Sequence, residues 1–197
     1  TLIQRQEPAQ APWTPVTDYS FEARKAIEGI HPQLIKDVFQ PKFVLDAGAG
    51  TGALLQMLQQ LGVEGNGFDA NPQPQGLQFL WRQRLDDTNP PVEWDLPYVD
   101  YDLVICREVL EHLTLAQIKR AVWNLCRLTG KFVYVTTRFA KAPDHLLDVD
   151  TSDDLDPDHR TMLNQSFLRL LFVLEGFKRR ADLEAKMDWQ QKSRVLV

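Results

Sequence analysis

Residues 42–52 read KFVLDAGAGTG, and this stretch decides the fold. A short apolar run ends at Asp46 and passes directly into a glycine-rich turn. Glycine permits positive φ angles and lets a ligand approach the main chain closely. Apolar residues then recur at helical spacing until Gly62, namely Leu54, Leu55, Met57, Leu58 and Leu61. The pattern predicts a strand, a tight turn and a helix whose first N–H groups have no helical partners.

Other strand and helix patterns alternate on both sides of this unit. Strands are predicted at residues 65–68, 92–94, 103–106 and 132–135, and two closing strands from residue 177 onward and at residues 194–197. Helices are predicted at residues 20–39, at about 114–128, and from Asn164 or Ser166 to just before Gly176. The alternation predicts a mostly parallel sheet with helices on both faces. In such sheets, functional residues follow the carboxyl ends of the strands.

Length and composition indicate an ordinary globular chain. The 197 residues fit one domain, predicted over residues 20–197 and preceded by a polar, proline-containing arm at residues 1–19. Apolar residues make up 44% and charged residues 25%, which excludes a mainly disordered chain. The chain has no apolar run long enough to span a membrane, and residues 1–20 lack the apolar core of a secretion signal.

Cysteine content indicates the cellular compartment, and net charge indicates which kinds of partner to expect. Cys106 and Cys126 are too few for a disulfide framework or a metal knuckle, so a reducing compartment, the cytoplasm, is predicted. The net charge is −5, and the only basic cluster is Lys178-Arg179-Arg180. Proteins that bind nucleic acid usually present a basic face to the phosphates, so this balance argues against a nucleic-acid partner.

Three acids stand at predicted strand ends. Asp46, at the end of the first strand, would repel a pyrophosphate and attract a cationic group such as an ammonium or sulfonium. Asp69, at the end of the second, can accept hydrogen bonds from a ribose diol. Asp95, predicted at the end of the third, can accept from an exocyclic amine. One ligand with an amino-acid end, a ribose and an adenine fits all three.

Simpler interpretations of the same residues stay open. The glycine turn could be a strand–helix turn without a ligand. Gly48, Gly50 and Ala53 also satisfy the loose dinucleotide pattern G-x-G-x-x-A, which would suit an NAD(P)-dependent oxidoreductase. Asp69 could simply cap the turn at Asn71-Pro72.

The motifs together resemble those of a known family. Residues 44–52 (VLDAGAGTG), 67–72 (GFDANP), 95–96 (DL) and 101–113 (YDLVICREVLEHL) look like successive motifs of class I S-adenosylmethionine-dependent methyltransferases. Their order and spacing match over about residues 42–137. The resemblance implies a doubly wound, Rossmann-like α/β fold. Its sheet would have seven strands in the order 3-2-1-4-5-7-6, with the last strand antiparallel.

The resemblance also implies an activity and a binding site. The activity is methyl transfer from S-adenosyl-L-methionine to a small-molecule acceptor, at oxygen or nitrogen, which leaves S-adenosyl-L-homocysteine. The implied cofactor-binding residues are Asp46, Gly48, Ala49, Gly50, Gly52, Asp69, Ala70, Asp95, Leu96, Cys106 and Arg107. A protein that kept the nucleotide pocket without catalysis is a further alternative.

Candidate catalytic side chains follow the fourth strand. His112, Glu108 and His159 are the leading candidates for a base that accepts the acceptor's proton, and Glu111 and His145 are others. Glu108, Glu111, His112 and His159 also make a mixed oxygen and nitrogen set for a divalent metal. That set is similar to the one in methyltransferases that modify the terminal ribose of small RNAs, so a metal-dependent 2′-O-methyltransferase is the first alternative. Because a phosphate-binding face is missing, we predict no metal.

An acidic segment lies between the fifth strand and the last helix. Residues 144–158 contain seven aspartates and no Lys or Arg. The segment is either a solvated acidic loop or a lid over a cationic or polyhydroxylated substrate, and it is predicted to be mobile when the acceptor is absent. Arg138, just past the fifth strand, could instead face a substrate carboxylate or phosphate.

Overall fold

A computed structural model describes residues 29–72, 78–97, 101–142, 144–148, 158–188 and 195–197. The predicted arm at residues 1–19 and the start of the helix predicted at residues 20–39 lie outside these ranges. Most of the acidic segment, residues 149–157, also lies outside them. Within the described ranges, no helix combines the length and the hydrophobicity needed to cross a bilayer.

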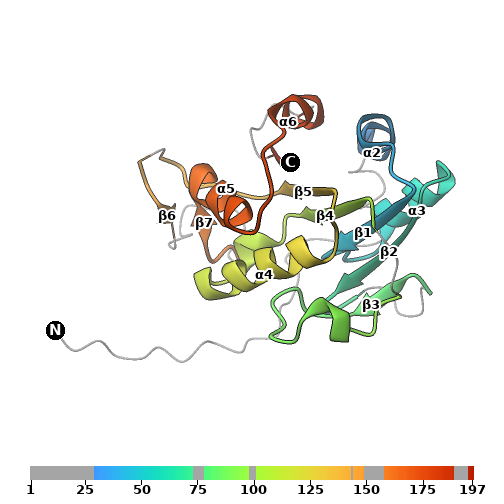
Figure 1. Cartoon of the computed structure of the whole chain (residues 1–197), viewed down its shortest axis with the longest axis horizontal. Coiled ribbons are helices and arrows are strands. Elements are labelled where there is room, and N and C mark those ends of the chain that lie inside the picture. Colours follow the sequence, from blue (N-terminus) through green and yellow to red (C-terminus); the bar gives the residue numbers. More distant parts are fainter. Residues whose placement is uncertain (1–28, 73–77, 98–100, 143, 149–157, 189–194) are drawn as a thin grey trace.

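The main sheet has six strands in the order β3-β2-β1-β4-β5-β8. Their bounds are β1 Phe43–Ala47, β2 Glu64–Asp69, β3 Leu80–Arg82, β4 Leu103–Arg107, β5 Phe132–Thr136 and β8 Val195–Leu196. Strands β1 to β5 pair in parallel, and β8 runs antiparallel to β5. The carboxyl ends of the parallel strands therefore share one edge of the sheet (Figure 1). The order of the first five strands, 3-2-1-4-5, is the predicted one, and the difference lies in the strands beyond β5.

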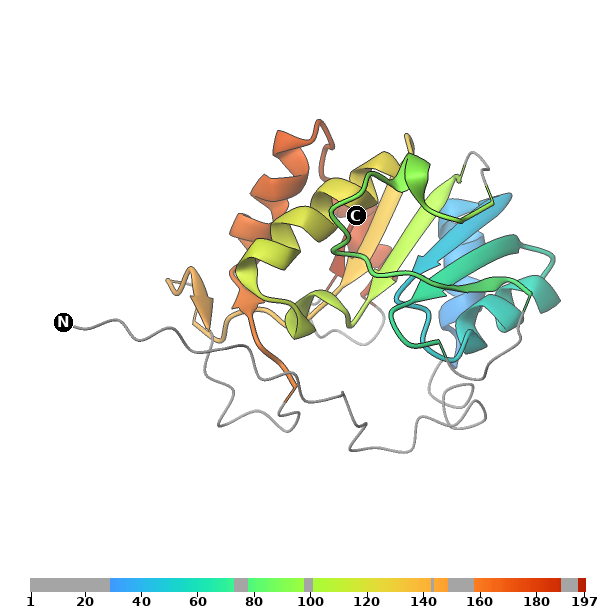
Figure 2. The same ribbon diagram turned by 90° about the horizontal axis from the view of Figure 1, so that it is seen from below.

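Helices cover both faces of the sheet, as predicted. Helices α2 (His31–Phe39), α3 (Ala53–Gln60) and α6 (Ala181–Met187) pack on one face, and α4 (Leu115–Arg127) and α5 (Gln165–Leu174) pack on the other (Figures 1 and 2). Alternate residues of each strand face opposite layers, so Val133 and Val135 join the core under α4 and α5, whereas Tyr134 joins the core under α2 and α3. This double burial explains why the central strands are continuous apolar runs.

The closing strands differ from the prediction. The segment from residue 177 onward was expected to pair with the last strand, but the structure has helix α6 at residues 181–187 and assigns no strand to residues 177–180. Arg180 N donates to Val197 O at 2.7 Å, which is one backbone bond rather than a ladder. The described sheet therefore has six strands, not seven.

The third strand was also misplaced in the sequence analysis. It is β3, Leu80–Arg82, which pairs with β2 through three residue pairs, whereas residues 91–93 form a single turn of 3₁₀ helix, η1 (Pro91–Glu93). Pro90 and Pro91 explain the difference, because proline has no N–H to donate to a strand ladder. Trp94, the apolar end of the predicted strand, is buried against Phe68, with ring centroids 5.4 Å apart.

A small second sheet lies beyond the carboxyl edge of the main one. Strand β6 (Leu147–Asp148) pairs antiparallel with β7 (Met162–Leu163), on the side toward which the arrowheads of β1, β4 and β5 point (Figure 1). Asn164 then caps α5, since its side chain accepts a hydrogen bond from Ser166 N at 2.8 Å. The second sheet therefore pairs residues 147–148, within the acidic segment, with residues 162–163, which follow it.

Candidate functional site

The turn after β1 is tied to its neighbours and open on one side. Gly48 N and Ala49 N donate to Phe68 O at 2.8 and 3.0 Å. Gly48 has φ of +91°, and a Cβ atom there would lie 2.3 Å from Val109 Cγ2, so the position requires glycine. A Cβ atom at Gly50 would instead meet no atom within 4 Å, so the turn borders open space at that point.

Asp46 and Asp69 bring two carboxylates to this turn. Asp46 is the fourth residue of β1 and only 4% exposed. Asp69 ends β2, and its two carboxylate oxygens accept hydrogen bonds from Gly50 N at 2.9 Å and Asn71 N at 2.8 Å. Asp69 therefore does cap the turn at Asn71. Each carboxylate oxygen has a further lone pair, so capping leaves ribose binding possible. Ala70, the next residue, is exposed.

The remaining implied cofactor residues differ in how accessible they are. Asp95 is exposed, but it follows η1 rather than a strand, and Leu96 packs against the core. Cys106 is fully buried in β4, and burial together with nearby acids raises the pKa of its thiol well above its usual value. Arg107, at the end of β4, is half-buried. Its side chain is therefore more accessible to a ligand than that of Cys106.

The candidate catalytic residues gather where β4, β5 and the start of β7 meet. Glu108 has φ of +51°, a left-handed conformation that is uncommon for a side chain of its size. Glu111 and His112 belong to a 3₁₀ turn, η2 (Leu110–His112). The rings of His112 and His159 lie 5.0 Å apart between centroids, and His112 Nδ1 donates to Asp158 O at 3.2 Å.

Glu111 ties this cluster together. Its backbone oxygen accepts hydrogen bonds from Arg160 N at 2.7 Å and Thr161 N at 3.1 Å, which holds His159 beside η2. Its side chain, in a residue only 1% exposed, accepts from Thr137 Oγ1 at 2.8 Å. Burial and the neighbouring Glu108 carboxylate raise the pKa of Glu111 to about 8. Thr137 was not among the predicted site residues, although its hydroxyl directly after the fifth strand could have indicated a role.

The same four side chains do not fit a metal ion as they stand. Within the described ranges, no group of three or more His, Cys, Asp and Glu side chains is arranged to hold one. Glu111 accepts a hydrogen bond from Thr137, and burial together with the Glu108 carboxylate raises its pKa, so a metal at this carboxyl would have to displace the proton.

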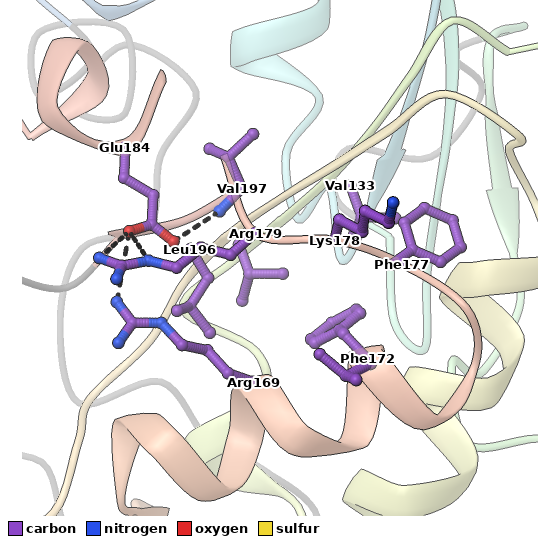
Figure 3. Close-up of a pocket in the computed structure, with 11 residues that line it drawn as sticks. Val133, Arg169, Phe172, Phe177, Lys178, Arg179, Glu184, Leu196 and Val197 are labelled. Carbon is purple, nitrogen blue, oxygen red and sulfur yellow. Dashed lines mark hydrogen bonds and ion pairs between the residues drawn. The ribbon is translucent and has the colours of Figure 1, made fainter. Parts of the chain in front are cut away.

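Two hollows lie outside this cluster. One is a cavity of about 40 Å³ between β5, β8 and α5, with apolar walls that include Phe172, Phe177 and Leu196 (Figure 3). At its rim, the buried Glu184 carboxylate pairs with Arg169 at 3.3 Å and with Arg179 at 2.7 Å. That volume suits a few water molecules and not a cofactor. The other is a larger surface hollow of about 440 Å³ between β6 and the start of α5.

Comparison with known proteins gave a family match and several similar folds. A family model described as a methyltransferase domain matches residues 20–180. A comparison with curated proteins gave no match. A solved structure of a SAM-dependent methyltransferase from Archaeoglobus fulgidus is 20% identical, with 81% of this chain and 70% of that one covered and a TM-score of 0.58.

Two further solved structures name their reactions. A sugar N-methyltransferase from Streptoalloteichus sp. is 12% identical, with 91% of this chain and 92% of that one covered and a TM-score of 0.57. An O-methyltransferase family protein from Burkholderia thailandensis is 12% identical, with 81% of this chain and 54% of that one covered and a TM-score of 0.54. These likenesses confirm the predicted Rossmann-like fold.

Proposed function

The chain belongs to the methyltransferase domain family, and from that premise we propose that it transfers a methyl group from S-adenosyl-L-methionine to a small-molecule acceptor. The nucleophile of the acceptor is an oxygen or a nitrogen, and the product of the donor is S-adenosyl-L-homocysteine. Membership of the family agrees with the enzyme class that the motifs predicted.

The observation that carries the proposal is the buried Asp46 carboxylate beside a glycine turn that borders open space. A pyrophosphate over this turn would meet a negative charge, whereas the ammonium and sulfonium groups of the donor are attracted to it. Asp69 lies beside the same turn through its bond from Gly50 N, where it can accept hydrogen bonds from the ribose. These features favour the methyl donor over NAD(P).

The chain's own residues would position the acceptor and handle its proton. The bound donor supplies an electrophilic methyl group, and the protein holds the nucleophile in line with it. His112, Glu108 and His159, which lie around Glu111, are the side chains proposed to accept the proton that the nucleophile loses. Thr137 and the backbone of residues 160–161 hold this group in place through Glu111.

Two features favour a small-molecule acceptor over RNA. The only basic cluster is partly neutralised, because Arg179 pairs with Glu184 and Arg180 with Asp182. The solved structures of similar fold include a sugar N-methyltransferase, which is a protein with a small-molecule acceptor.

The two cysteines are buried and unbonded, which agrees with the proposed cytoplasmic location.

Thermal unfolding with S-adenosylhomocysteine tests the donor site. The ligand should raise the unfolding temperature of the wild-type protein, because it binds only the folded state. Asp46→Asn should lose most of this shift, while Asp37→Asn, a change of an exposed acid on α2, should keep it. A folded Asp46→Asn protein with an unchanged shift would remove the argument from Asp46.

A further inference from the structure

The larger surface hollow lies between β6 and the start of α5. We call it the β6–α5 hollow, and it is lined by Asp144, His145, Leu146, Asn164, Ser166, Phe167 and Leu170. The hollow is shallow and open to solvent, so it would contact one face of a small ligand rather than enclose it. Its described lining residues come from two short segments, residues 144–146 and 164–170.

Backbone hydrogen bonds connect this hollow to the catalytic cluster. Thr161 N donates to Glu111 O at 3.1 Å, β7 follows directly, and Asn164 N donates to Leu146 O at 2.8 Å. The second sheet lies on the side of the molecule toward which the carboxyl ends of the main strands point (Figures 1 and 2). The hollow is therefore on the acceptor side of the proposed site.

One wall of the hollow is apolar and accessible. Leu146 is 58% exposed and Leu170 is 47% exposed, and the half-buried Phe167 lies between Ser166 and Leu168 on the first turns of α5. Large apolar side chains that line a concave surface offer contact area to the apolar part of a ligand. This wall suits a hydrocarbon or ring portion of an acceptor.

The polar wall is acidic. Among the residues that the structure describes, Asp144 is the only carboxylate that lines the hollow, and none of the described Lys or Arg side chains lines it. His145 Nδ1 lies 2.9 Å from Asp148 Oδ1, and Asp148 Oδ2 accepts from Lys141 N at 2.9 Å. These bonds lower the pKa of Asp148, which therefore places a second negative charge beside the His145 ring. Because Asp148 contacts Nδ1, the Nε2 atom of His145 is the one that could contact a ligand. Among the neighbouring cations, Lys141 and Arg160 are exposed and do not line the hollow.

We propose that the β6–α5 hollow binds the acceptor, and that the acceptor is an amine-bearing molecule with an apolar portion. The assignment as acceptor rests on the proposed methyl transfer, which it deepens by naming a substrate class. Asp144 attracts the ammonium group, and Leu146, Leu170 and Phe167 cover the apolar portion. Carboxylate and phosphate acceptors are disfavoured, because the described part of the lining offers no cation to compensate their charge.

A pair of probes of opposite charge tests this. The full chain, saturated with S-adenosylhomocysteine, is titrated by calorimetry with 2-phenylethylammonium and with phenylacetate, which share a benzyl group. The ammonium probe should bind at least tenfold more tightly than the carboxylate probe. Asp144→Asn should remove most of that preference, whereas Asp182→Asn, which changes an exposed acid on α6, should leave it intact.

A second pair of variants tests the apolar wall. Leu170→Ala should weaken binding of the ammonium probe several-fold, while Leu174→Ala, at a more exposed leucine of the same helix, should not. Equal binding of both probes, or a preference that survives Asp144→Asn, would overturn the proposal. Binding of S-adenosylhomocysteine is measured first, so loss of donor binding, which contradicts the proposed function, is distinguished from loss of probe binding alone.

Discussion

Asp69 shows how one side chain serves the fold and the proposed ligand together. Its carboxylate ties the glycine turn to β2 through Gly50 N and caps the chain at Asn71 N. The same carboxylate stands at the carboxyl end of β2, where a ribose diol would be bound. Asp69 therefore holds the turn in shape and stands where the proposed ligand would bind.

We predict that Asp69→Ala weakens binding of S-adenosylhomocysteine by roughly tenfold or more. Hydrogen bonds to a charged group contribute about 1.5–3 kcal/mol each, and the variant removes those to the ribose. Calorimetry on folded protein checks this, with Asp37→Ala as a control at an exposed acid on α2. Unchanged affinity in the folded variant would mean that Asp69 only caps the turn.

Glu111 makes stability depend on pH. Burial and Glu108 raise its pKa to about 8 in the folded protein, from an ordinary value of 4.5. The folded state therefore holds the proton more tightly than the unfolded state. The stability that this provides is fully present below pH 4.5 and is lost as the pH rises to about 8.

We predict that Glu111→Gln removes this pH dependence. Between the two pKa values the wild-type free energy of unfolding should fall by up to about 1.4 kcal/mol per pH unit from this group. The neutral amide of the variant cannot ionise, so its advantage over wild type should grow from pH 5 to pH 8. Denaturant unfolding at several pH values measures the difference, and Glu93→Gln, at an exposed glutamate, serves as control. Parallel pH curves for wild type and Glu111→Gln would contradict the buried, protonated carboxyl.

At the level of elements, the sequence predicted the pieces with strong local signals. Helix α4 was expected at about residues 114–128 and spans Leu115–Arg127, where Gln117 Oε1 accepts hydrogen bonds from Thr114 N and Oγ1. Strand β4 was expected at residues 103–106 and spans Leu103–Arg107. Long apolar runs and capping residues determine such elements locally, so these elements can be predicted before the fold is known.

Elements that depend on distant partners were missed. Strand β3 is three residues long and is defined by its pairing with β2, and the second sheet consists of two-residue strands. Dependence on distant partners also explains which site residues the sequence predicted and which it did not. Asp46, Asp69 and Glu108 lie at or directly beside recognisable strand ends, whereas Thr137 and Asp148 matter because of the side chains that they contact, Glu111 and His145.

The turn between β1 and α3 offers a prediction at this scale. Gly48→Ala places a Cβ atom 2.3 Å from Val109 Cγ2 at a residue with φ of +91°. We expect a loss of about 1–3 kcal/mol in the free energy of unfolding, the usual cost of such backbone strain. Gly130→Ala, where a Cβ atom would meet nothing within 4 Å, should change it by less than about 0.5 kcal/mol. Equal effects of the two substitutions in denaturant unfolding would show that the turn tolerates a side chain.

At the scale of the molecule, charge is distributed in a way that suits the proposed reaction. The net charge is −5, and acids stand at the donor turn, in the catalytic cluster and in the β6–α5 hollow. The donor is a cation at its sulfonium, and an amine acceptor is a cation before it loses its proton. A long-range negative potential would draw both to the same edge of the sheet.

Calorimetric titration with S-adenosylhomocysteine and, separately, with NAD⁺ tests the central claim most directly. The two ligands share adenosine and differ in what lies over the glycine turn, an amino-acid group or a pyrophosphate. Because Asp46 is buried beside that turn, we predict measurable binding of S-adenosylhomocysteine and none of NAD⁺ at the same concentration. Tighter binding of NAD⁺ would contradict the assignment of the site to a methyl donor.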